Sequence, residues 1–202
     1  FLTVLLLTVL RKKIYVYLMS NGYEEYEYVL GKNFKWIYGF MFKIVTKFSI
    51  VIVCHSRLFD PKKSHEITPS RLNNIWIKNC NLPNLDKPRL LYVGRINPEK
   101  GINNFISLFN KMNTDSELFI AGNTERLKYT DHKIKSLGYI SSEQELIKTY
   151  DSCNITILPS YTEAHPYVLE ESLARKRPIV IFKYLFGLEI PSNNFKVFLD
   201  VF

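Results

Sequence analysis

Apolar and polar segments alternate regularly through the second half of the chain. Short runs of β-branched and aliphatic residues are separated by longer stretches in which apolar residues recur at helical spacing. Strands that alternate with helices form a mostly parallel sheet with helices on both faces, so an α/β fold with a doubly wound sheet is predicted. The predicted strands are 90–93, 118–121, 134–137, 155–158 and 179–182, and the predicted helices are 102–112, 142–151 and 168–175.

The first half of the chain contains strand-like runs at 14–19 and 49–54. Between them, apolar and aromatic residues at helical spacing predict a helix over 34–48. The chain opens with a continuous apolar run over 2–10, which is too short to span a bilayer. Basic residues follow this run, whereas a signal peptide places them before it. We expect 2–10 to be a buried strand, because strands covered on both faces are continuously apolar.

Four prolines in the polar stretch 58–88 predict a connection between two domains. We assign residues 1–70 to a partial N-terminal domain, 71–88 to a linker and 89–202 to a C-terminal ligand-binding domain. A chain of 202 residues is short for a two-domain enzyme. We therefore expect a fragment in which the first domain is incomplete and the second lacks only its extreme C-terminus.

Composition and charge narrow the class of protein. Hydrophobic residues make up 47% of the chain and charged residues 23%, which excludes a disordered protein. The three cysteines lack zinc-site or disulfide spacing, so we expect no metal and a cytoplasmic location. The net charge of +8 is uneven: residues 1–88 contain 13 Lys and Arg against 6 Asp and Glu, and residues 89–202 contain 14 against 13. The first part is therefore the one suited to an anionic surface.

The loop 94–101 follows the first predicted strand of the second domain. Ligands of open α/β sheets bind outside the carboxyl ends of strands, so this loop is well placed for binding. Gly94 permits a close approach of the backbone, and Arg95 and Lys100 supply two cations for a diphosphate. Taken alone, the two cations are slightly more typical of ordinary surface charges on a solvated loop. Neither the GxGxxG fingerprint nor the P-loop is present, which argues against nicotinamide enzymes and phosphate-hydrolysing NTPases.

Two glutamates, Glu163 and Glu171, lie eight residues apart across a predicted loop-to-helix junction. Carboxylates accept hydrogen bonds from vicinal hydroxyls, so one could bind a sugar ring and the other a ribose. Tyr167 and Val168 lie at the start of the predicted helix 168–175, Tyr167 directly before it, and the exposed amides there favour an anionic phosphate. The alternative is that the pair consists of a loop acid and a helix-surface acid. His165 either faces the bound sugar or has a structural role.

These motifs together resemble group 1, family four, glycosyltransferases of the GT-B type. The resemblance is strong over residues 89–183 and weak over 14–57, and it implies two Rossmann-like domains, the first on the acceptor side. It also implies that Arg95 and Lys100 bind the diphosphate of a UDP- or GDP-sugar, Glu163 the donor sugar and Glu171 the ribose. The stretch Leu137-Gly138-Tyr139 resembles the segment that, in this family, packs near the base of the nucleotide. Such enzymes usually need neither metal nor cofactor.

The chain departs from the family's pattern at two places. Ala164-His165-Pro166 stands where the family often has Gly-Phe-Gly, and Pro166 removes one backbone donor. Leu18-Met19-Ser20-Asn21 stands where many members place a catalytic histidine. The second departure keeps open a nucleotide-sugar-binding subunit without activity. A GT-B nucleotide-sugar epimerase is the other alternative.

The helix predicted over 34–48 combines an apolar stripe with Lys35, Lys43, Lys47 and the aromatic Trp36. Such a helix either attaches to an anionic membrane, which would suit a lipid-linked acceptor at the inner face, or packs on its own domain while the lysines stay solvated. No nucleic-acid-binding motif accompanies the charge, so nucleic acid is not an expected partner. The predicted function is retaining hexosyl transfer to a glycan or lipid-linked acceptor in polysaccharide or lipopolysaccharide biosynthesis.

Overall fold

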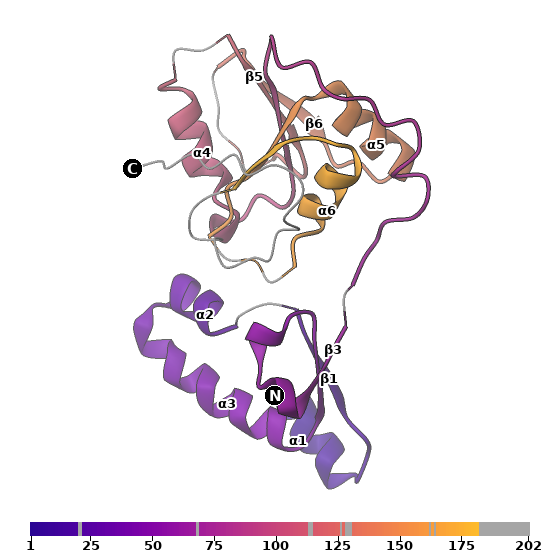
Figure 1. Cartoon of the computed structure of the whole chain (residues 1–202). Coiled ribbons are helices and arrows are strands. Elements are labelled where there is room, and N and C mark those ends of the chain that lie inside the picture. The colour runs from indigo at the N-terminus through magenta and orange to yellow at the C-terminus, as the bar shows by residue number, and fades with distance from the viewer. Residues whose placement is uncertain are drawn as a thin grey trace. The chain divides into compact units, whose positions relative to one another are not determined.

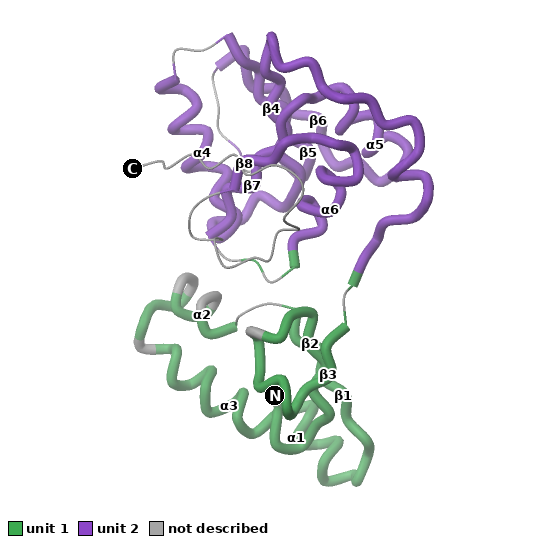
Figure 2. The backbone as a smooth tube through the Cα atoms, viewed as in Figure 1, with its two compact units in different colours: residues 1–69, 162–165 green, residues 70–161, 166–202 purple. Residues whose placement is uncertain are grey.

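The computed structural model divides into two compact units (Figure 2). Unit 1 comprises residues 1–69 and 162–165, and unit 2 comprises residues 70–161 and 166–202. The structure describes residues 1–19, 22–67, 69–112, 115–125, 127, 131–161, 163 and 165–181. The last residues of the chain, including the end of the strand predicted at 179–182, lie outside the described residues.

Unit 2 is built on a parallel five-stranded sheet with helices packed around it (Figure 1). The sequence pattern located each of these strands and the three helices around them to within three residues at either end, which confirms the predicted α/β class. In their order across the sheet the strands are β6 (Ile134–Gly138), β5 (Glu117–Ala121), β4 (Arg89–Val93), β7 (Ile155–Leu158) and β8 (Ile179–Ile181). The helices are α4 (Ile102–Phe109), α5 (Glu143–Ser152) and α6 (Tyr167–Ala174).

Alternate residues of the central strand β4 face opposite sides of the sheet. Leu90 and Tyr92 pack in one buried cluster with Phe105 of α4, whereas Leu91 packs in another with Ile147 of α5. A third cluster joins Leu169 of α6 to β7 and β8. Because strand side chains alternate, these clusters place α4 on one face and α5 and α6 on the other. The sheet is doubly wound, as the sequence predicts.

Unit 1 contains a parallel three-stranded sheet, β1 (Tyr15–Leu18), β2 (Ile50–Val53) and β3 (Ser64–Glu66), in that order. Helices α2 (Gly22–Leu30) and α3 (Lys35–Lys47) pack through aromatic rings, with Tyr23 edge-on to Tyr38 at 4.9 Å between ring centroids. Trp36 and Phe40 on α3 are 71% and 61% exposed. Within the described part of the chain, no helix combines the length and apolarity needed to cross a membrane.

The prediction of a strand over 2–10 was wrong. The structure has helix α1 (Leu2–Val9) there, without a buried residue. A short, continuously apolar run has no periodicity that separates strand from helix, and its five leucines favour the helix. Helix α2 and strand β3 were not predicted, because α2 is rich in Glu and Tyr and β3 has only three residues.

The stretch 71–88, which the prolines mark as a linker, is held closely on unit 2. Trp76 is 3% exposed and donates from Nε1 to Glu143 of α5 at 2.8 Å. Cys80 contacts the carbonyl of Ala174, and the Asn154 side chain donates to the carbonyl of Lys87. These contacts anchor the stretch to both α5 and α6, so it forms part of the packing of unit 2.

The start of α5 provides a test of local stability. Ser142 is its N-cap, and the Ser142 side chain accepts a hydrogen bond from the amide of Glu145. Ser142→Ala should lower the free energy of unfolding by about 1 kcal/mol, because one amide of the first turn loses its acceptor. Urea unfolding followed by circular dichroism measures the change. The exposed neighbour Ser141 supplies the control Ser141→Ala, and equal effects of the two substitutions would contradict the cap.

Candidate functional site

A cavity of about 430 Å³ opens at the carboxyl ends of β4, β5 and β6. Three consecutive strand-to-loop junctions line it: Gly94 to Asn97 after β4, Gly122 to Glu125 after β5, and Tyr139 with Ile140 after β6. Parallel strands bring these loops to one edge of the sheet, which is where open α/β sheets bind ligands. The volume lies within the range of small-molecule sites.

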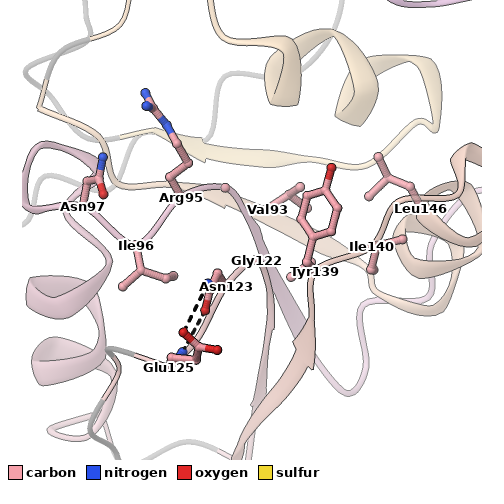
Figure 3. A pocket seen from close by; sticks show the side chains of 12 residues that line it. Val93, Arg95, Ile96, Asn97, Gly122, Asn123, Glu125, Tyr139, Ile140 and Leu146 are labelled. Atoms are coloured by element: carbon pink, nitrogen blue, oxygen red, sulfur yellow. Dashed lines mark hydrogen bonds between the residues drawn. The ribbon is translucent and has the colours of Figure 1, made fainter.

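The cavity has chemically different sides (Figure 3). Tyr139, Ile140 and Leu146 of α5 lie together on one side and offer an apolar wall. Arg95 and Asn97 lie on the other side, and the Glu125 carboxylate accepts from the Asn123 side chain. Tyr139 is 80% exposed, so its ring is accessible to a flat ligand group.

Backbone contacts hold the lining loops in place. The amide of Gly94 donates to the carbonyl of Ala121 at 3.0 Å, and the amide of Gly122 donates to the carbonyl of Gly138 at 2.8 Å. The hydroxyl of Tyr92 donates to the carbonyl of Arg95 at 2.6 Å. The backbone that presents Arg95 to the cavity is therefore held by the end of β5 and by a buried side chain, and the loop after β5 is itself held to the end of β6.

Lys100 ends a short 3₁₀ helix, η4 (Pro98–Lys100), just before α4. The following residue, Gly101, is left-handed with φ of 68° and lies against the carbonyl of Pro159. The amide of Tyr161 donates to the carbonyl of Glu99 at 2.9 Å, which ties η4 to the loop after β7. Lys100 and the loop after β7 are thereby held at the same edge of the sheet.

Glu171 lies in the second turn of α6 and is 8% exposed. Its Oε2 accepts a hydrogen bond from the Tyr150 hydroxyl of α5 at 2.8 Å. Burial raises the pKa of Glu171, and the hydrogen bond from Tyr150 and the charge of Arg71 partly oppose this. At the beginning of α6, the Arg71 guanidinium lies over the ring of Tyr167, 4.4 Å from its centroid.

The structure brings only part of the predicted site together. Gly94, Arg95 and Tyr139 line one cavity. Lys100 lies at the end of the same loop, and Tyr167, Val168 and Glu171 belong to α6. Glu163 and His165 are half-buried and group with unit 1, whereas the loop on either side groups with unit 2. The roles assigned to these residues remain predictions.

Sequence reasoning did not identify Tyr150 and Arg71 as neighbours of the predicted site. Tyr150 belongs to the apolar stripe of α5, where it is indistinguishable from a core residue. Arg71 lies in the proline-marked stretch, and only the packing of that stretch on unit 2 brings it to α6. Asn123 and Glu125 were missed too, although their position directly after a predicted strand was an available signal. Within the described ranges, no three His, Cys, Asp or Glu side chains are grouped to hold a metal.

A doubly wound sheet with a cavity at its carboxyl edge defines a Rossmann-like ligand-binding domain. Residues 76–199, more than half of the chain, match the family described as glycosyl transferases group 1. The chain belongs to this family.

Relatives and solved structures agree with the family and the fold. The chain is 29% identical over 107 residues to an uncharacterized glycosyltransferase of Methanocaldococcus jannaschii, a match that covers 48% of this chain and 27% of that protein. Anabaena HepE in complex with UDP-glucose is similar with a TM-score of 0.70, at 12% identity, over 96% of this chain and 60% of that chain. TarM is similar with a TM-score of 0.65, at 18% identity, over 93% of this chain and 40% of the TarM chain. These likenesses show the GT-B fold, and the chain spans only part of each protein's length.

Proposed function

We propose that the protein transfers a hexosyl unit from a UDP- or GDP-sugar to a glycan or lipid-linked acceptor, with retention of the anomeric configuration. The observation that supports this most directly is the cavity beside the Arg95 loop in a member of the group 1 glycosyl transferases. HepE was solved in complex with UDP-glucose and has the same fold, which favours a nucleotide-sugar donor.

In this proposal the cavity receives the nucleoside, with Tyr139 and Leu146 on the apolar side of the base. Arg95 and Lys100 bind the diphosphate, and the amides at the beginning of α6, at Tyr167 and Val168, add partial positive charge. The carboxylate of Glu171 accepts from the ribose hydroxyls. Glu163 accepts from hydroxyls of the donor sugar.

Charge develops on the diphosphate as the bond from the anomeric carbon to its oxygen breaks. Arg95 and Lys100 stabilise that charge and so lower the barrier to departure of the nucleotide. The leaving phosphate oxygen accepts the proton of the acceptor hydroxyl as the new glycosidic bond forms on the same face of the sugar. No step requires a further co-reactant.

Lys100→Ala tests this assignment. The substitution should weaken binding of the UDP- or GDP-sugar by about 10- to 100-fold, because one charge-assisted bond to the diphosphate is lost. Isothermal titration calorimetry of the protein in its full natural length measures the change. Lys111→Ala is the matched control, since Lys111 is an exposed lysine just beyond α4 and its substitution removes the same charge.

Activity measurements on the same protein separate the proposed transfer from its alternatives. Transfer of the sugar to an acceptor supports the proposal. Donor binding without hydrolysis or transfer would indicate a binding subunit, and release of an epimerised nucleotide sugar would indicate an epimerase. A folded wild-type protein that binds neither UDP- nor GDP-sugars would overturn the whole assignment.

A further inference from the structure

A fully buried hydroxyl lies next to Glu171. The side chain of Tyr150 is 0% exposed, and its hydroxyl donates to Oε2 of Glu171 at 2.8 Å. Burial and the neighbouring carboxylate raise the pKa of Tyr150 well above its usual value, so the phenol keeps its proton and remains a donor. Among the hydrogen bonds between side chains of the described residues, this is one of the few that lie entirely in the interior.

The surroundings of Tyr150 fix its ring. Trp76 packs edge-on against it, with 5.8 Å between the ring centroids, and Ile147 and Leu91 belong to the same buried cluster. Trp76 is itself held by its hydrogen bond to Glu143 at the start of α5. The backbone carbonyl of Tyr150 accepts from Nε of Arg177 at 2.9 Å. A side chain restrained on so many sides presents its hydroxyl in one position.

We infer that Tyr150 is a positioning residue for Glu171, fixing this carboxylate so that it can receive the ribose of the donor nucleotide. The inference rests on the proposed function. Oε2 is engaged by the phenol, and Oε1 is the acceptor that we assign to a ribose hydroxyl. A glutamate has three rotatable side-chain bonds, and holding it by one oxygen removes the need to order it when the nucleotide binds.

The buried position of Glu171 explains why a positioning group is needed. A carboxylate with 8% exposure would be poorly solvated without a donor, and the Tyr150 hydroxyl supplies one. Two other charged groups act on it: Arg71, from the stretch before β4, lowers the pKa of Glu171, and Glu170, its neighbour on α6, raises it. Tyr150→Phe removes only the hydroxyl and leaves both of these groups in place.

The test compares two ligands within each variant. The nucleotide that binds wild-type protein more tightly, UDP or GDP, is titrated beside its 2′,3′-dideoxy form. The dissociation constant of the dideoxy form divided by that of the parent nucleotide gives the contribution of the ribose hydroxyls. Tyr150→Phe should reduce that ratio by about tenfold while dideoxy binding stays unchanged. Because each ratio is taken within one variant, a smaller folded fraction cancels from it.

A double-mutant cycle shows whether Tyr150 acts through Glu171. Glu171→Gln should reduce the ratio at least as far as Tyr150→Phe does, and Tyr150→Phe combined with Glu171→Gln should be no lower than Glu171→Gln alone. Thr149→Val is the matched control. It removes a neighbouring hydroxyl of α5 that bonds only the backbone carbonyl of Glu145, at 2.8 Å, so the wild-type ratio is expected.

The pH dependence of the ratio gives a second measurement. The hydrogen bond from Tyr150 lowers the pKa of Glu171, so its loss should raise that pKa and move the decline of the ratio on acidification to higher pH. Titration of the phosphates affects the parent nucleotide and its dideoxy form alike, so it cancels from the ratio.

The outcomes distinguish this inference from the proposed function. Wild-type protein that binds neither UDP nor GDP overturns both. A Tyr150→Phe protein with the wild-type ratio, or with both ligands weakened equally, overturns the positioning role and leaves the proposed function standing.

Discussion

Arg175→Met is expected to lower the free energy of unfolding by about 3 to 5 kcal/mol. Arg175 is 1% exposed, and its Nη1 donates to the carbonyls of Trp76 and Lys78 at 2.8 Å each. Nε and Nη2 donate to the two carboxylate oxygens of Asp151 at 2.9 and 2.7 Å. Methionine fills much of the volume of the side chain but donates no hydrogen bond. The carbonyls of Trp76 and Lys78 then lose their strong donor and keep only the weak thiol of Cys80, at 3.5 and 3.8 Å.

Urea unfolding followed by tryptophan fluorescence measures this loss, and Trp76 reports locally on the stretch that Arg175 holds. Lys176→Ala is the control, because Lys176 is the adjacent residue and is exposed. Its effect should stay within about 0.5 kcal/mol. A midpoint for Arg175→Met close to that of the control would show that the carbonyls of residues 76–78 find other partners.

The sequence predicted unit 2 well because its signals are local. Strands β4, β5, β7 and β8 are short, mainly apolar runs bounded by polar or glycine-containing loops, and α4 shows clear helical periodicity. The edge strand β6 is more polar, with Lys135 and Ser136 exposed. The carboxyl-edge position of the 94–101 loop followed from strand order alone, and Gly94 and Arg95 indeed line the cavity. Local pattern and global topology agree in this part of the chain.

Other features depend on long-range packing and could not be predicted in this way. The stretch 71–88 looks like a linker because its prolines and polar residues are visible, whereas its anchors, Arg175 and Arg177, lie about a hundred residues later. Glu171 was predicted as a site residue from its spacing to Glu163. Its hydrogen bond to Tyr150 connects α6 with α5, across 21 positions of the sequence, and its burial results from the packing of these helices, which no local pattern reveals.

Gly101→Ala is expected to destabilise the fold by about 3 kcal/mol and to weaken nucleotide binding by the protein that remains folded. A Cβ at this position would lie 2.0 Å from the carbonyl oxygen of Pro159, which belongs to the backbone and cannot move aside as a flexible side chain could. The left-handed φ of 68° adds about 1 kcal/mol of strain for any residue with a Cβ. Relief of the clash must separate η4, which contains Lys100, from the loop after β7.

Gly138→Ala separates these two contributions. Gly138 has the same φ of 68°, but an added Cβ there meets no atom within 4 Å. Its substitution should therefore show the backbone strain alone, about 1 kcal/mol in urea unfolding. The difference between the losses of unfolding free energy in the two variants measures the cost of the clash between a Cβ at residue 101 and the carbonyl of Pro159. If both variants lost the same stability, that contact would not hold the Lys100 loop, and Gly101→Ala should then bind nucleotide as the wild type does.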